Sequence, residues 1–135
     1  MLFPAKMPGL RPFLWLFFVY TAVWISLEGV LWRVVVMGVG VTAVTVAFLL
    51  QRTVGGKHFS VVGFVVLVTA AGLLFGVLSS LFTLIFMAIK TGLHAHGPEF
   101  TRAELVWVWR HLPVWAVAGG FAGGGLGLVL VWLRD

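Results

Sequence analysis

The chain has 135 residues, of which 61% are hydrophobic and only 10% are charged. A soluble domain carries roughly 25% charged residues, so these few charges cannot cover a water-exposed surface, and lipid must surround most of the chain. The net charge of +5 comes from nine Lys and Arg residues that stand singly at the ends of apolar runs, a pattern that favours interfacial anchoring and argues against nucleic-acid binding.

Four long uncharged runs are the dominant pattern, and each is close to the ~20 residues that cross a ~30 Å hydrocarbon core. They cover residues 12–27, 34–50, 61–89 and 114–133. We therefore predict an all-α, polytopic integral membrane protein with a single domain over residues 1–135. Its four transmembrane helices should form two hairpins. The lead-in over residues 1–12 contains three prolines and is expected to be irregular.

The first two runs cannot form one helix. A helix over residues 12–50 would be roughly 58 Å long, which is almost twice the hydrocarbon thickness. The segment EGVLWR, residues 28–33, contains a glycine and two charges, and we predict the turn of the first hairpin there. The third run has the opposite problem, because residues 61–89 would form a helix of roughly 43 Å. Its start should lie at the interface, or the helix should project from the bilayer or bend at Ser79–Ser80.

The polar segment before the last run, residues 90–112, begins with KTGLHAHGPEFTRAE. Thr101 and Glu104 match a capping box, in which the hydroxyl and the carboxylate satisfy free amides at a helix start. We predict a short helix over residues 102–111 that is separate from the last span. Pro113 then fits the first turn of that span.

Four spans place both termini on one side of the membrane. That side has five basic residues: Lys6, Arg11, Arg52, Lys57 and Arg134. The other side has four: Arg33, Lys90, Arg102 and Arg110. By the positive-inside rule we expect a multi-pass protein of the cell membrane with both termini in the cytoplasm.

The histidines of the polar segment are the candidate metal ligands. His94 and His96 could bind one metal ion, with Glu99 or His111 as a third ligand. Such an H-x-H pair is a weak motif, and the chain has no cysteine to support it. A transmembrane bis-histidine haem is less favoured still, because all four histidines lie at span edges, and an interfacial axial haem ligand from His58, His94 or His111 is a minor alternative. The favoured interpretation is a wet interfacial loop, so we predict no metal, no other cofactor and no catalytic residue, and hence no enzyme.

Glu28 is the carboxylate nearest to the membrane interior, at the end of the first span. Membrane carboxylates are costly and often functional. Glu28 could couple ion transport, but a structural pair with Arg33, Lys90 or Arg110 is the favoured interpretation.

Small residues recur every four positions in two spans. The third span has Gly72, Gly76 and Ser80, and the last has Gly119, Gly120, Gly123 and Gly124. In lipid, such residues let helices approach closely. They can pack within the chain or against another protein.

The leading functional hypothesis is a small non-catalytic accessory or assembly subunit of a larger membrane complex, or a homo-oligomer packed through these glycine-rich faces. The alternative is a small oligomeric transporter or channel that uses Glu28. The expected partners are bilayer lipids and other membrane subunits or further copies of the chain, without nucleic acid.

Seven tryptophans complete the pattern. Trp15 and Trp132 belong to the side of the termini, and the others lie toward the opposite side: Trp24, Trp32, Trp107, Trp109 and Trp115. This distribution is typical of interfacial aromatic belts, although a tryptophan-rich ligand pocket is an alternative.

Overall fold

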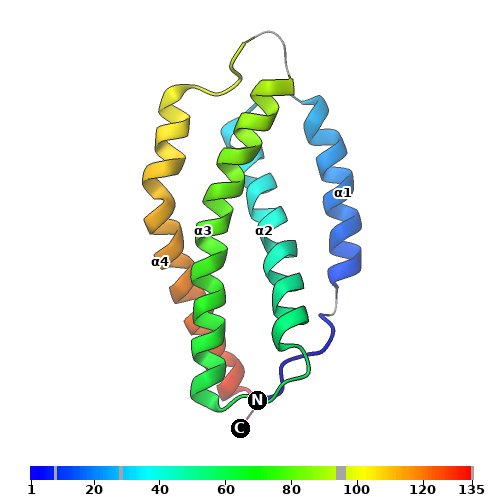
Figure 1. Cartoon of the computed structure of the whole chain (residues 1–135), viewed down its shortest axis with the longest axis vertical. Helices are drawn as coiled ribbons and strands as arrows, with labels where there is room; N and C mark the ends of the chain where they lie inside the picture. The colour runs from blue at the N-terminus through cyan, green and yellow to red at the C-terminus, as the bar shows by residue number, and fades with distance from the viewer. Residues whose placement is uncertain (8, 28, 94–96, 135) are drawn as a thin grey trace.

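The structure is a computed structural model that describes residues 1–7, 9–27, 29–93 and 97–134. This described part forms four helices: α1 (Leu10–Ser26), α2 (Leu31–Val54), α3 (Val61–Leu93) and α4 (Arg102–Trp132). The helices run alternately up and down, so both termini lie at the same end of the molecule (Figure 1). The predicted all-α fold of two hairpins is confirmed.

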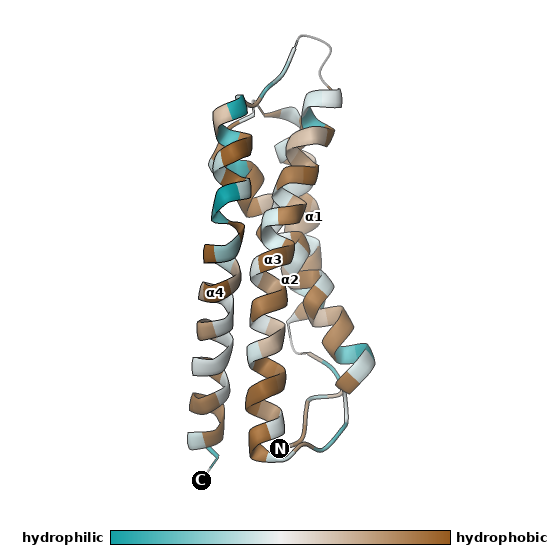
Figure 2. Cartoon of the chain, turned by 60° about the vertical axis from the view of Figure 1, so that its left-hand side comes forward, coloured by the Kyte–Doolittle hydropathy of each residue, from teal (hydrophilic) through white to brown (hydrophobic). Residues whose placement is uncertain are grey.

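Helices α2, α3 and α4 are long and apolar enough to cross a membrane, whereas α1 is a shorter apolar helix of 17 residues. At 1.5 Å per residue α1 is about 26 Å long, at the lower end of the range for spanning helices. In α2, Arg33 and Arg52 bracket an uncharged stretch of about 28 Å, which matches the hydrocarbon core. Hydrophobic residues extend along the helices, and the hydrophilic residues of α4 gather in its upper part (Figure 2). The chain is therefore an integral membrane protein by the length and composition of its helices.

The prediction of a short helix separate from the last span is wrong. α4 is one helix of 31 residues with Pro113 inside it. Proline removes one backbone hydrogen bond, the one that Trp109 would accept, and membrane helices tolerate such a loss when nearby groups satisfy the freed carbonyl. The capping box is confirmed at the start of this helix, where the Thr101 hydroxyl accepts a hydrogen bond from the Glu104 N–H at 3.2 Å.

The long third run forms one helix of 33 residues that continues through Ser79 and Ser80. At 1.5 Å per residue α3 is about 50 Å long and α4 about 46 Å. Both exceed a ~30 Å hydrocarbon core. Whether the extra length of α3 lies at the interface or projects beyond the bilayer stays a prediction.

The N-terminal lead-in is more ordered than expected, because it pairs with the loop between α2 and α3. Leu2 and His58 form an antiparallel β-bridge. The Phe3 N–H donates to the Lys57 carbonyl at 3.0 Å, and the buried Phe3 ring lies 6.5 Å from the ring of Phe64 on α3. The lead-in thus covers the lower end of α3.

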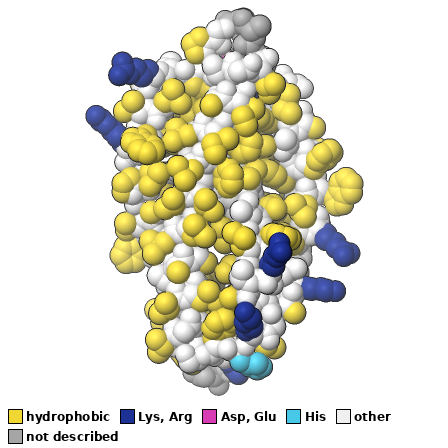
Figure 3. Space-filling model, viewed as in Figure 1, with side chains coloured by type: hydrophobic (Ala, Val, Ile, Leu, Met, Phe, Trp, Pro, Cys, Tyr) yellow, Lys and Arg dark blue, Asp and Glu magenta, His cyan; other side chains and the backbone are white. Residues whose placement is uncertain are grey.

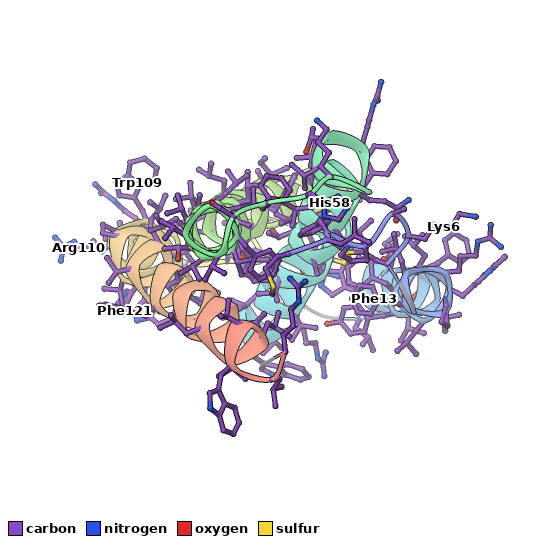
Figure 4. All side chains as sticks on the ribbon, turned by 90° about the horizontal axis from the view of Figure 1, so that it is seen from below. Lys6, Phe13, His58, Trp109, Arg110 and Phe121 are labelled. Carbon is purple, nitrogen blue, oxygen red and sulfur yellow. The ribbon has the colours of Figure 1, made fainter. Side chains whose placement is uncertain are left out.

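The helices pack in chain order, α1 on α2, α2 on α3 and α3 on α4. From below, α4 and α1 lie at opposite edges of this arrangement (Figure 4). The result is an open layer with long free surfaces. Hydrophobic side chains cover most of the face shown in Figure 3, with Lys and Arg side chains at its upper left edge and in its lower half. Such a surface suits lipid as its solvent.

Glycines bring the backbones of α3 and α4 into direct contact. A Cβ added at Gly72 would lie 2.9 Å from the Gly119 carbonyl carbon, and one added at Gly76 would lie 2.7 Å from the Ala116 Cα. A Cβ added at Gly123 would lie 3.2 Å from the Gly72 Cα. The structure therefore places these glycines at the α3–α4 contact within the chain.

The other predicted packing residues have looser or different neighbours. Gly120 faces the Leu73 side chain, with an added Cβ 2.8 Å from Cδ2, and Gly124 faces Thr69 Oγ1 at 3.1 Å. Ser80 is buried, and its hydroxyl donates within α3 to the Gly76 carbonyl at 3.5 Å. The closest approach of α3 and α4 thus depends on only part of the predicted glycine set.

Candidate functional site

The most distinctive polar site surrounds Lys90, near the C-terminal end of α3. The Lys90 side chain is only 1% exposed. Its ammonium donates hydrogen bonds to the backbone carbonyls of Trp24 at 3.0 Å, Ile25 at 3.5 Å and Leu27. These carbonyls lie at the C-terminal end of α1, where a helix leaves its last carbonyls without the usual intrahelical N–H partners. The Trp24 carbonyl also accepts a hydrogen bond from the Leu27 N–H at 3.2 Å. Lys90 therefore caps a helix that is more than sixty positions away in the sequence.

Three features compensate the buried charge of Lys90. The C-terminal end of a helix carries partial negative charge that attracts a cation. The Trp24 ring centroid lies 4.8 Å from the ammonium, within the range of a cation–π interaction. Glu99 Oε2 lies 4.0 Å from the ammonium and belongs to a side chain that is 9% exposed. We call Trp24, Lys90 and Glu99 the Lys90 cluster.

Local sequence explains why α1 needs this external cap. The last turn of α1 contains no basic residue, and the backbone becomes extended at Leu27. Gly29 then permits the close approach of the loop before α4, because a Cβ at this position would lie 2.9 Å from the Glu99 Cβ and would overlap its carboxylate. The φ of Gly29 is not positive, so its backbone conformation does not demand a glycine. The close contact with Glu99 is therefore the reason for a glycine at this turn.

The Lys90 cluster joins three segments: the end of α1, the end of α3 and the loop that leads into α4. Removing a partner from a buried ion pair is strongly destabilising. This arrangement holds α1 against the rest of the layer at the end where Trp24 also packs edge-on against Phe86 of α3, with ring centroids 5.9 Å apart. The Lys90 cluster thus acts as an electrostatic cap at the C-terminal end of α1.

The predicted metal ligands do not form a cluster in the described part of the chain. His94 and His96 lie outside the described residues. Glu99 is paired with Lys90, whereas His111 stacks on Trp107 with ring centroids 4.3 Å apart, and its Nδ1 lies 2.8 Å from the Trp107 carbonyl oxygen. Among the described residues there is no group of three His, Cys, Asp or Glu side chains that could hold a metal ion.

Glu28 also lies outside the described residues, so its pairing stays a prediction. Of its three expected partners, Lys90 is buried in the cluster described above. The Arg33 guanidinium lies 5.5 Å from the Trp32 ring centroid. Arg110 is exposed and points away from the other helices (Figure 4). The three side chains therefore have very different surroundings.

Buried hydroxyls between α2 and α3 form a second polar group. Thr42 donates to the Gly38 carbonyl at 2.8 Å, and Thr83 donates to the Ser79 carbonyl at 2.7 Å. Each of these bonds stays within its own helix, which satisfies the hydroxyl without linking the helices. Ser79 Oγ is buried and has no hydrogen-bond partner among the described residues.

Comparison with known proteins finds no matching family model, no similar curated protein and no similar solved structure.

Proposed function

We propose that this chain is a small, non-catalytic integral membrane protein that acts as an accessory or assembly subunit of a larger membrane complex, or assembles with copies of itself. Its termini would face the cytoplasm, in line with the small excess of basic residues at their end. The observation that carries this proposal is the outer face of α4.

α4 has glycines on two sides. Gly119 and Gly123 contact α3 closely, whereas a Cβ added at Gly125 meets no atom within 4 Å. Phe121, one turn away from Gly125, exposes 80% of its surface and points away from the layer (Figure 4). A glycine inside a helix costs roughly 0.5–1 kcal/mol relative to alanine. In a membrane that cost is offset when another helix packs closely against the glycine.

A partner helix on this outer face would provide such packing. The small surface at Gly125 and the protruding ring of Phe121 offer a hollow and a knob next to each other. Lateral packing of this kind needs no catalytic group. In the described part of the chain, the buried Lys90 is engaged in capping α1.

The test is extraction of the native membrane in a mild detergent, followed by identification of co-purifying proteins and measurement of the particle mass. A reproducible partner or a discrete homo-oligomer is expected, and Gly125→Leu and Phe121→Ala should each release it. Phe48→Ala is the matched control, because Phe48 is 52% exposed on α2. A monomer alone in the extract, or equal losses with Phe48→Ala, would overturn the proposal.

The transporter alternative has one observation in its favour: Lys90, an expected partner of Glu28, donates to the carbonyl of Leu27, the residue before Glu28. The same extraction distinguishes the two functions. A lone homo-oligomer whose pH-dependent transport in vesicles is lost in Glu28→Gln, with assembly intact, would favour the transporter.

A further inference from the structure

A groove of about 620 Å³ lies between the N-terminal halves of α2 and α4. α2 contributes Trp32, Val35 and Val36 to its lining, and α4 contributes Glu104, Trp107 and Trp115. The two helices are not direct neighbours in the layer, because α3 packs between them. The groove therefore follows from the open arrangement of the helices.

The groove is polar at one end and apolar at the other. Glu104 marks the end near the start of α4, and Trp115 lies about 16 Å further along the same helix. On α2, Val35 and Val36 follow Trp32 toward the middle of the helix. Arg33 directly precedes the uncharged stretch of α2. The polar end of the groove therefore lies at the level of the membrane interface and the apolar end within the hydrocarbon core.

Hydrogen bonds hold the Glu104 carboxylate in place at the polar end. Its Oε2 accepts hydrogen bonds from the Thr101 N–H at 2.7 Å and from the Thr101 hydroxyl at 2.9 Å. The positive end of the α4 dipole also favours a negative charge here. The half-buried carboxylate thus borders the groove in a fixed orientation.

Three indole rings line the same groove. Indole faces attract ammonium groups, and cages of aromatic rings recognise substituted ammonium ligands. A carboxylate beside these rings adds charge complementarity to a cation. His111 stacks on Trp107 and so fixes the orientation of that ring.

From this combination we infer that the groove binds a phospholipid whose headgroup carries an ammonium, such as phosphatidylethanolamine. The ammonium lies between Glu104 and the indoles, and an acyl chain follows Val35, Val36 and Trp115 into the membrane. Arg33 does not line the groove, but its guanidinium lies 5.5 Å from the centroid of the Trp32 ring, which does, and we place the lipid phosphate beside it. The occupant must be an amphiphile, because the lining changes from charged to apolar along its length.

Native mass spectrometry in a neutral detergent tests this inference by titration with dioleoyl-phosphatidylethanolamine and, separately, dioleoyl-phosphatidylglycerol, which has the same chains without the ammonium. We expect phosphatidylethanolamine to bind about five- to tenfold more tightly. Glu104→Gln should abolish this preference while keeping the helix start, since glutamine also serves in a capping box. Trp107→Leu should weaken binding of phosphatidylethanolamine.

Trp109→Leu is the matched control, because Trp109 lies on the same helix but points outward (Figure 4) and does not line the groove. It should leave the lipid preference unchanged. Equal affinity for the two lipids, a preference that survives Glu104→Gln, or an equal effect of Trp109→Leu would overturn the inference. Binding of dodecyltrimethylammonium without binding of either phospholipid would also overturn it, in favour of a small lipophilic cation.

Discussion

Replacing Gly72 with alanine tests the close contact of α3 and α4. The new Cβ would lie 2.9 Å from the Gly119 carbonyl carbon and 3.1 Å from the Gly123 Cα, whereas ordinary contacts of a Cβ begin at 3.4 Å. The obstructing atoms belong to the backbone, so no change of rotamer can make room. The new Cβ would also overlap the Gly119 carbonyl oxygen. The two helices must therefore separate by about 1 Å, and such a gap forfeits up to about half of the dispersion energy of each contact.

The magnitude follows from two opposing effects. Overpacking costs typically about 1–3 kcal/mol, and alanine gains roughly 0.5–1 kcal/mol over glycine within a helix. The difference between these ranges is about 0–2.5 kcal/mol. Because the new Cβ overlaps a backbone oxygen, we expect Gly72→Ala to lower the free energy of unfolding by about 1–2 kcal/mol. Gly125→Ala has the same chemistry but open space around the new Cβ, so it should raise the free energy of unfolding by roughly 0.5–1 kcal/mol.

Reversible unfolding in mixed micelles of a neutral detergent and dodecyl sulfate measures both variants, with far-UV circular dichroism as the signal. The opposite signs of the two effects are the decisive result. If Gly72→Ala were as stabilising as Gly125→Ala, the backbone contact between α3 and α4 would not exist in the folded protein.

The same assay checks two further predictions. Lys90→Met removes the cap of α1 and leaves the Glu99 carboxylate without this cation, so a loss of about 3–5 kcal/mol is expected. The double variant Lys90→Met/Glu99→Gln should recover part of that loss, and an unchanged stability of Lys90→Met would contradict the capping role. Thr101→Ala removes the hydroxyl that accepts from the Glu104 N–H, which should cost about 0.5–2 kcal/mol, whereas Thr101→Ser should stay close to the parent protein.

The sequence by itself determined the features that depend on neighbouring residues. Run length and apolar content predicted the four helices, because helical hydrogen bonds are local and transfer into lipid depends on composition. The capping box of Thr101 and Glu104 could be predicted from the sequence for the same reason, since both of its hydrogen bonds join residues three positions apart. The turn near Gly29 followed from the thickness of the bilayer.

Helix boundaries at polar positions were less predictable. Residues 102–112 contain enough charge to suggest a separate helix, and Pro113 suggested a new start. In the structure the helix continues through the proline because α4 packs along α3, and this packing compensates for one missing backbone hydrogen bond.

Only the tertiary structure decided which polar and small residues meet. Lys90 was one of three possible partners for Glu28, and nothing in its neighbourhood indicated that it caps α1. Likewise, Gly119 and Gly125 look equivalent along the chain, but one contacts α3 and the other faces outward. These outcomes depend on the rotation of each helix about its axis and on the order in which the helices pack. Both are set by side-chain contacts between segments that are distant in the sequence.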